Sequence, residues 1–587
     1  MAARPEHAAK KARPLSPRRR PRTSAGDTGS TFTSKGRIAM TGNDTARTHV
    51  DVVVVGAGFA GVYSLHKLRG MGLSVRGFES GTDVGGTWYW NKYPGARCDV
   101  ESIEYSFGFS DEIQQKWDWS HRFSFQPDIQ RYISHVADKL DVRKLIDFRT
   151  KIVSMTYDGD SQTWTVTTDK GEVITCRYCV MATGNLSIPL FPAIPGLDSF
   201  EGEKYHSGRW PAEKVDFTGK RVAVFGTGAT GIQIVPEVAK EASKLYVMQR
   251  SPNFSLPAGN RPLSKEYLDG VRKTYPDLRQ RAKHHVFGTA AIPEPTQSAL
   301  ELSEDELFQK FEELWANGGS INFQMAFTDF MRNEEANKRL SDYVRYKIRQ
   351  TVKDPETAEK LCPKDHPIGS KRICIDTDYY ETFNRDNVEL VSLRENPVVR
   401  ITPHSIVLQD GEIEVDALVF ATGFDAVTGS LTNIDITGRN GLKLADKWGK
   451  RPSSYLGFAI AGFPNMFLIT GPGSPAVKSN MVLSIEQHVD MIGETIAYMQ
   501  KTGSGAIEAQ VEAEDKWVEY VTEVANQTLY VKADSWYTGA NVPGKARMFV
   551  PFVGGAQNYR KICEDVVADG FRGFTLEPES TPEKRSA

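Results

Sequence analysis

A glycine-rich segment near residue 56 has the spacing of a dinucleotide-binding turn. It follows the β-branched run 52–55 and contains Gly56, Gly58 and Gly61. The first glycine allows a tight bend, the second lets the backbone approach a pyrophosphate, and the third lets helix and strand pack closely. Glu79 stands at the end of the next apolar run, where its carboxylate can accept from both ribose hydroxyls. Because that carboxylate would repel a 2'-phosphate, this site suits FAD or NAD rather than NADP.

A second motif of the same kind follows the apolar run 222–225. It contains Gly226, Gly228, Thr230 and Gly231. Its second strand, at 245–248, leads into Gln249-Arg250-Ser251 rather than an acid. Arg250 offers a fork of donors to a phosphate dianion, and Ser251 offers a hydroxyl. We therefore expect NADP at the second site and FAD at the first. The alternative for Arg250 is an ordinary pairing with a surface acid.

The elements around these motifs indicate an α/β fold. Each motif lies between an apolar strand and a helix, and further strands are expected at 388–391 and 417–420. Between them, Ser303-Glu304-Asp305-Glu306 has the pattern of a capping box. The fold class predicted is therefore α/β, with two Rossmann-like dinucleotide-binding domains and a helical insertion.

Composition excludes several other classes. The 587 residues carry 72 Lys plus Arg against 74 Asp plus Glu, a net charge of −2, so no global field favours nucleic acid or an anionic membrane. No apolar stretch reaches the roughly 18 residues that span a bilayer. Six cysteines are too few for a disulfide scaffold. Cys176 and Cys179 have metal-ligand spacing without a second pair, and we expect reduced core thiols and no metal there.

Two dinucleotide sites suggest that electrons pass from a nicotinamide to a flavin, and the next acceptor must be found. A disulfide oxidoreductase would need a redox-active cysteine pair beside the flavin, but Cys98 has no neighbouring cysteine. A disulfide oxidoreductase is therefore disfavoured.

Two further patterns carry a family resemblance. Residues 200–211 match FxGxxxHxxxWP, and residues 85–99 match [AG]GxWxxxx[FY]P[GM]xxxD at every fixed position. With both glycine motifs in order, the chain resembles the Baeyer–Villiger monooxygenases, which are class B flavoprotein monooxygenases, and in particular their phenylacetone and steroid monooxygenase branch. The resemblance covers roughly residues 48–575. It implies that NADPH reduces FAD, that O2 then forms a C4a-peroxyflavin, and that this peroxide attacks a ketone to give an ester or a lactone.

The resemblance also implies three catalytic candidates. Arg372 looks like the family's active-site arginine, whose permanent charge keeps the flavin peroxide anionic. Asp99 resembles the acid that orients this arginine, although an acid after a Pro-Gly turn can also be a plain turn cap. His206 is the third candidate. A linker histidine is more often a hydrogen-bonded structural residue, and in the family it couples domain positions, so we prefer that role.

Further site residues follow from the same resemblance. Gly86, Thr87 and Trp88 would bind the flavin nucleotide, and Lys371 with Arg250 would clamp the 2'-phosphate. Trp536 lies in a segment that resembles the mobile loop over the nicotinamide; ordinary core packing is its alternative. Val477, Lys478 and Met481 lie in a segment that resembles the substrate-pocket loop. Lys478 departs from the family, where this position is usually apolar, and it either reaches solvent or biases substrate choice.

The domain boundaries follow these motifs. We expect a disordered basic tail at 1–47, in which Met40 is a candidate start. We expect FAD-binding segments at 48–184 and 422–577, NADP-binding segments at 185–255 and 370–421, and a helical insertion at 256–369. We also expect a monomeric, cytoplasmic protein whose partners are a small-molecule ketone and O2, without nucleic acid or membrane. A sulfur- or nitrogen-oxidising flavin monooxygenase is one alternative, and a non-catalytic flavin-binding sensor is another.

Overall fold

The structure is a computed structural model that describes residues 48–580 of the chain. The expected basic tail at 1–47, with Met40, lies outside the described residues. None of the helices between residues 48 and 580 combines the length and the apolar character that crossing a bilayer requires.

The first glycine motif joins a strand and a helix, as the sequence predicts. β1 (Thr48–Val55) leads into α1 (Phe59–Gly70), and β2 (Val75–Glu79) returns parallel to β1. β6 (Val173–Met181) lies parallel on the other side of β1. Glu79 is the last residue of β2, so its carboxylate stands at the same sheet edge as the glycines.

These strands belong to an eight-stranded mixed sheet in the order β17-β4-β5-β6-β1-β2-β3, with β18 paired to β6. β4 and β5 form an antiparallel meander with β6, while β17 and β18 add in parallel from the C-terminal part of the chain. The remaining strands of this sheet are β3 (Ile146–Phe148), β4 (Ile152–Asp158), β5 (Thr163–Thr168), β17 (Asp435–Thr437) and β18 (Met466–Leu468).

The second glycine motif has the same local arrangement. β8 (Arg221–Phe225) leads into α5 (Ala229–Glu241), and β9 (Lys244–Gln249) returns parallel to β8. Its sheet has the order β12-β9-β8-β16-β7 and is parallel throughout. The outer strands are β7 (Glu203–His206), β12 (Val388–Ser392) and β16 (Ala417–Phe420). Both strands expected at 388–391 and 417–420 are thus present.

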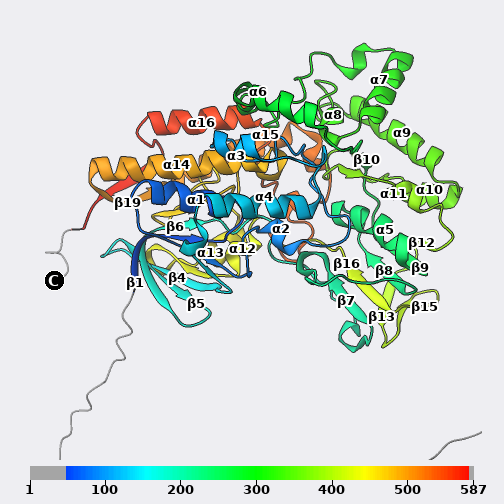
Figure 1. The fold of residues 1–587 in the computed structure, drawn as a ribbon, viewed down its shortest axis with the longest axis horizontal. Coiled ribbons are helices and arrows are strands. Elements are labelled where there is room, and N and C mark those ends of the chain that lie inside the picture. Colours follow the sequence, from blue (N-terminus) through cyan, green and yellow to red (C-terminus); the bar gives the residue numbers. More distant parts are fainter. Residues whose placement is uncertain (1–47, 581–587) are drawn as a thin grey trace, which may run out of the picture. The chain divides into compact units, whose positions relative to one another are not determined.

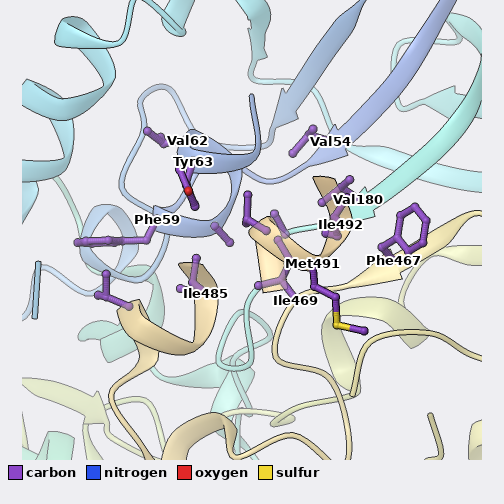
Figure 2. Close-up of a cluster of buried hydrophobic side chains, with 14 of the residues drawn as sticks. Val54, Phe59, Val62, Tyr63, Val180, Phe467, Ile469, Ile485, Met491 and Ile492 are labelled. Carbon is purple, nitrogen blue, oxygen red and sulfur yellow. The ribbon is translucent and has the colours of Figure 1, made fainter. Parts of the chain in front are cut away.

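Apolar residues on both faces explain why the central strands read as continuous hydrophobic runs. Val52 and Val54 belong to one buried cluster, and Val53 and Val55 belong to another on the opposite face. The first cluster fills the space between β1, β6 and β18 and the helices α1 and α14 (Met481–Thr502), as Figure 2 shows. The second sheet is likewise covered on both faces.

The helical segment between the two halves of the second sheet packs in two places. α7 (Glu304–Asn317) begins at Ser303 with the expected capping box and buries Leu307 and Phe311. α7 and α9 (Glu334–Thr351) contribute apolar residues to a buried cluster of the second sheet. Figure 1 shows both helices at the same end of the molecule. α6 (Lys265–Lys283) instead contributes Leu268 and Tyr275 to the first cluster. The insertion therefore contributes to the buried clusters that pack against both sheets.

The remaining helices and strands complete the parts of the molecule around the two sheets. They are α2 (Thr87–Trp90), α3 (Asp111–Lys116), α4 (Gln126–Lys139), β10 (Ser255–Pro257), α8 (Ser320–Gln324), α10 (Pro355–Leu361), β11 (Cys374–Asp376), α11 (Tyr379–Thr382), β13 (Val398–Ile401), β14 (Ser405–Leu408), β15 (Glu412–Glu414), α12 (Gly429–Thr432), α13 (Leu444–Lys450), β19 (Ser504–Ala509), α15 (Val511–Asn526), α16 (Ala556–Ala568) and β20 (Phe574–Pro578). The described chain is a mixed α/β protein built on parallel sheets.

Candidate functional site

A cavity of about 1440 Å³ runs along the carboxyl ends of the parallel strands in both sheets. Its walls include Glu79 at the end of β2 and Phe225 at the end of β8. The carboxyl edge is where open parallel sheets bind ligands. The volume exceeds the roughly 300–1,000 Å³ of a site for one small ligand. The cavity therefore has room for more than one ligand.

Most residues expected from the sequence to form a site line this one cavity. They are Gly56, Gly58, Glu79, Gly86, Thr87, Trp88, Asp99, Gly226, Gly228, Thr230, Arg250, Ser251, Lys371, Arg372, Val477, Met481 and Trp536. Four expected residues are not in its wall. Gly61 and Gly231 lie behind it, His206 lies beside it, and Lys478 lines a smaller adjoining cavity.

The first glycine turn leaves no room for side chains. A Cβ at Gly56, whose φ is +105°, would lie 2.4 Å from the Ala182 carbonyl oxygen, and one at Gly61 would lie 1.9 Å from the Gly56 oxygen. Gly58 approaches Gly86, whose added Cβ would lie 2.9 Å from the Gly58 Cα. The Glu79 carboxylate accepts from the backbone N–H of Ala57 at 2.9 Å. It is thereby fixed at the edge of the cavity.

The second turn repeats this geometry at its first and third glycines, whereas a Cβ at Gly228 would meet nothing within 4 Å. A Cβ at Gly226 (φ +111°) would lie 2.4 Å from the Ala421 oxygen, and one at Gly231 would lie 1.9 Å from the Gly226 oxygen. Ala182 and Ala421 each begin an Ala-Thr-Gly segment, at 182–184 and 421–423, so these two segments close the two turns in the same way. The helices α1 and α5 both begin at a glycine, and no side chain caps either of them. Their first N–H groups are available to a pyrophosphate, so both turns fit a dinucleotide.

Cations gather where the second turn would receive a 2'-phosphate. Arg250 and Lys371 both line the cavity. Burial, followed by repulsion from Arg394 and then Arg250, lowers the pKa of Lys371. Arg394 donates to the Ser251 hydroxyl at 3.0 Å and forms an ion pair with Asp365. No sequence pattern selects Arg394, because it lies beyond β12 and 143 residues from Ser251.

Arg372 and Asp99 form a two-point ion pair in the cavity wall. Arg372 Nε donates to Asp99 Oδ2 at 2.8 Å, and Nη2 donates to Asp99 Oδ1 at 2.7 Å. Burial alone would raise the pKa of Asp99, but the guanidinium outweighs burial and leaves that pKa lowered. For Arg372, burial is likewise outweighed, and the carboxylate raises its pKa. Both groups are therefore charged at neutral pH.

The remaining contacts of Arg372 hold its side chain in place and leave part of that side chain exposed. Nη1 donates to the Val477 carbonyl at 3.0 Å, and the Asn253 side chain donates to the Arg372 carbonyl at 3.0 Å. One third of the Arg372 side-chain surface (33%) stays exposed, and Arg372 lines the cavity. A guanidinium held this way presents a fixed positive charge to whatever occupies the cavity.

His206 ends β7 and is buried in a fixed tautomer. The Gly208 N–H donates to its Nδ1 at 3.0 Å, so Nε2 carries the proton and donates to the Leu190 carbonyl at 3.3 Å. Burial is the main cause that lowers its pKa, to about 4. Its Nε2 lies 3.5 Å from the Thr422 hydroxyl, so His206 contacts the Ala-Thr-Gly segment that closes the second turn.

The segment 535–545 is tied down over the cavity. Trp536 and Asn541 line the wall, and Asn541 donates to the Phe424 carbonyl at 2.8 Å. Lys545 pairs with Asp425 at 2.5 Å and donates to the Ala426 carbonyl at 2.8 Å. Only 15% of the Lys545 side chain and 21% of the Asp425 side chain are exposed. These contacts therefore hold the loop against the wall of the cavity.

Two further residues at the site, Gln233 and Arg209, match no functional pattern in the sequence. Gln233 on α5 accepts from the Tyr93 hydroxyl at 3.0 Å and donates to the Arg97 carbonyl at 3.2 Å, which joins the second turn's helix to the segment that leads to Asp99. Arg209 lines the cavity with its guanidinium 4.4 Å from the Trp90 ring centre. Arg209 occupies a variable position of the FxGxxxHxxxWP pattern, so only its place in space identifies it.

Comparisons with known proteins agree with this geometry. The family model described as flavin-binding monooxygenase-like matches residues 49–258. The chain is 41% identical over 526 residues to a Baeyer–Villiger monooxygenase of Pseudooceanicola batsensis, covering 89% of this chain and 95% of that protein. It is 43% identical over 536 residues to a phenazine N-monooxygenase of Lysobacter antibioticus, covering 91% and 98%.

Solved structures give the same result. A steroid monooxygenase bound to NADP superposes with a TM-score of 0.86 at 47% identity, covering 90% of this chain and all of that one. A complex named OTEMO, solved with FAD and NADP, superposes with a TM-score of 0.87 at 43% identity, covering 90% and 99%. With this similarity over nearly the whole described chain, the protein belongs to the Baeyer–Villiger monooxygenase family of flavin-binding monooxygenases.

Proposed function

We propose that the chain is an FAD- and NADPH-dependent monooxygenase that inserts one oxygen atom of O2 beside the carbonyl of a ketone. The overall reaction is ketone + O2 + NADPH + H⁺ → ester or lactone + NADP⁺ + H2O. The observation that carries this proposal is the Arg372–Asp99 ion pair in the wall of a cavity that also contains both glycine turns.

The two turns divide the cofactors between them. FAD would be held by the first turn, with its pyrophosphate at the N-terminus of α1, its ribose on Glu79, and Gly86, Thr87 and Trp88 beside it. NADPH would be held by the second turn, with its 2'-phosphate among Arg250, Ser251 and Lys371. When bound, FAD accepts two electrons from NADPH and activates O2 for transfer of one oxygen atom.

Arg372 supplies the electrostatics of oxygen insertion. Its guanidinium stabilises negative charge on the transferred oxygen and on the former carbonyl oxygen of the substrate. In many enzymes, such stabilisation of developing charge by fixed groups is the largest single contribution to the rate enhancement. Asp99 holds the guanidinium plane in one orientation through two hydrogen bonds. Lysine would not replace it, because an ammonium is a point charge without the planar fork of donors that Asp99 holds in two places.

The remaining predicted site residues have supporting roles. Trp536 and the loop at 535–545 exclude water, which would otherwise divert the activated oxygen to hydrogen peroxide. Val477 and Met481 shape the space beside Arg372. His206 acts as a positioning residue, because its hydrogen bonds go to Leu190, Gly208 and Thr422 rather than into the cavity.

The domain organisation is part of the proposal. Two Rossmann-like domains would comprise 48–184 with 422–577 for FAD and 185–255 with 370–421 for NADP, with 256–369 as a helical insertion. The support is that β17 and β18 join the first sheet from the C-terminal part, while β12 and β16 join the second. The monomeric state and the cytoplasmic location stay predictions.

The test is product analysis with purified protein. A panel of linear, aromatic, cyclic and steroidal ketones is incubated with NADPH and ¹⁸O2, and mass spectrometry follows the label. We expect one labelled oxygen in an ester or a lactone, with NADPH consumed faster when the ketone is present. NADPH oxidation that yields only hydrogen peroxide with every ketone would contradict the proposal.

Nitrogen or sulfur oxidation is the second candidate, since the N-monooxygenase relative is as similar to this chain as many ketone-oxidising relatives. A sulfide and an N-heteroarene are therefore assayed beside the ketones. N-oxide formation with no ester from any ketone would favour this alternative.

A further inference from the structure

Lys478 occupies an unusual place for a lysine. It ends the short turn at Ala476–Lys478, next to Val477, whose carbonyl accepts from Arg372. Its ammonium lies 3.9 Å from the ring centre of Tyr530 and 4.9 Å from that of Tyr537. The side chain thus lies against two buried tyrosines, and the residue is only partly exposed.

No acid of the described residues offsets this charge. Burial, and then the positive charge of Arg372, lowers the pKa of Lys478 well below its ordinary value, and no carboxylate opposes these effects. Buried ammonium groups are otherwise paired. The two aromatic faces compensate only in part, because a cation–π contact gives no hydrogen-bond acceptor. Lys478 therefore lacks an anionic partner on its own chain.

The space beside Lys478 is a small cavity that adjoins the main one. It holds about 50 Å³ and is lined by Lys478, Ser320, Gln324 and Tyr537. It shares Arg372, Val477 and Asp99 with the main cavity, and both carboxylate oxygens of Asp99 already accept from Arg372. Since about 10–15 Å³ accommodates one water-sized atom, the space suits a group of about three to five heavy atoms. The Tyr537 side chain is fully buried, and its hydroxyl has no hydrogen-bond partner among residues 48–580.

We propose that this cavity is an anion subsite and that the substrate is a ketone carrying a carboxylate, whose charge Lys478 binds while its carbonyl lies at Arg372. A carboxylate fits the cavity volume, supplies the missing partner of the ammonium, and can also accept from the Tyr537 hydroxyl. The two cations would then fix both ends of one substrate molecule and set its orientation. This inference rests on the proposed function, because it names the substrate class of the same site.

A matched pair of substrates tests the subsite. 6-Oxoheptanoate and its methyl ester share the ketone but differ in charge, and each is assayed for kcat/KM of oxygen insertion and for Kd by calorimetry. We expect the wild-type protein to favour the acid at least tenfold in both measurements, as charge-assisted hydrogen bonds imply. The preference for the acid should decrease only slightly as the salt concentration rises, because the ion pair between the carboxylate and Lys478 is sheltered from bulk solvent.

Two variants separate charge from shape. Lys478→Met keeps the length of the side chain without its charge and should abolish the acid-to-ester preference. Lys478→Arg keeps the charge and should retain at least part of the preference for the acid. FAD content and the rate of flavin reduction by NADPH report whether each variant is folded.

The outcomes are distinct. A wild-type protein that does not favour the acid, or a Lys478→Met variant that keeps the wild-type preference, overturns the subsite. If neither ketone is oxygenated although the acid binds more tightly than the ester, the proposed reaction fails while the subsite stands.

Discussion

The Arg372 guanidinium and the Asp99 carboxylate meet edge to edge, through two N–O contacts of 2.8 and 2.7 Å, although 273 residues separate them in the chain. Asp99 lies four residues after Gly95, and Arg372 lies two residues before the start of β11 at Cys374. A two-point contact fixes both the position and the plane of the guanidinium, which a single contact would leave free to rotate. The pair thus ties the segment that follows the first glycine motif to the segment that leads into β11, within the wall of the cavity.

Replacing Arg372 should separate flavin reduction from oxygen insertion. In Arg372→Ala and Arg372→Lys, NADPH should still reduce the flavin, because the glycine turns and the 2'-phosphate cations are intact. Ester formation should fall by at least 100-fold, which is the order of effect when one donor to a developing oxyanion is removed. Stopped-flow absorbance measures reduction, and gas chromatography measures the ester. Oxygenation at the wild-type rate in Arg372→Ala would contradict the role given to this residue.

Much of the fold could be read from the sequence because its signals are local. The runs 52–55 and 222–225 are apolar on both faces, and the glycine spacing and Ser303 mark where helices begin. Arg394 and Gln233 could not be predicted in this way. Each is an ordinary polar residue whose role comes from partners far along the chain, Ser251 for one and Arg97 for the other. For Lys478 the sequence leaves open whether the side chain reaches solvent or biases substrate choice, and its contacts with Tyr530 and Tyr537 also come from partners far along the chain.

Loop closure should depend on the ion pair between Lys545 and Asp425. In Lys545→Met the loop at 535–545 loses its contacts to Asp425 and to the Ala426 carbonyl, so it should open more often and admit water. We expect the share of NADPH that ends as hydrogen peroxide to rise several-fold at nearly unchanged flavin reduction. Peroxide is measured with a coupled peroxidase assay. Lys561→Met, which breaks an exposed helix pair with Asp565, is the matched control and should leave coupling unchanged. Equal coupling in both variants would argue against a sealing role for the loop.

Coenzyme preference should reside in the cations around Ser251. Arg250→Ala removes one ligand of the 2'-phosphate, so KM for NADPH should rise at least tenfold while KM for NADH changes little, because NADH lacks that group. Arg394→Ala should have a smaller effect in the same direction, since Arg394 contacts Ser251 and is already paired with Asp365. Steady-state kinetics with both coenzymes give the comparison. A similar rise for NADPH and NADH in Arg250→Ala would place Arg250 outside the phosphate site.

His206 should affect stability in acid without shaping the pH profile of activity. Burial lowers its pKa to about 4 in the folded protein, against about 6.5 in the unfolded chain. Between these values the unfolded state binds more protons, so stability is complete above pH 6.5 and is lost as the pH falls toward 4, by at most about 3 kcal/mol. His488 is buried with a similarly lowered pKa of about 4 and contributes in the same sense. His206→Gln should therefore lessen, but not remove, the loss of stability between pH 6.5 and 4.5 in urea titrations. Because His206 stays neutral from pH 6 to 9, the variant should keep both limbs of the kcat/KM profile, whereas a missing limb would mean that His206 transfers protons during catalysis.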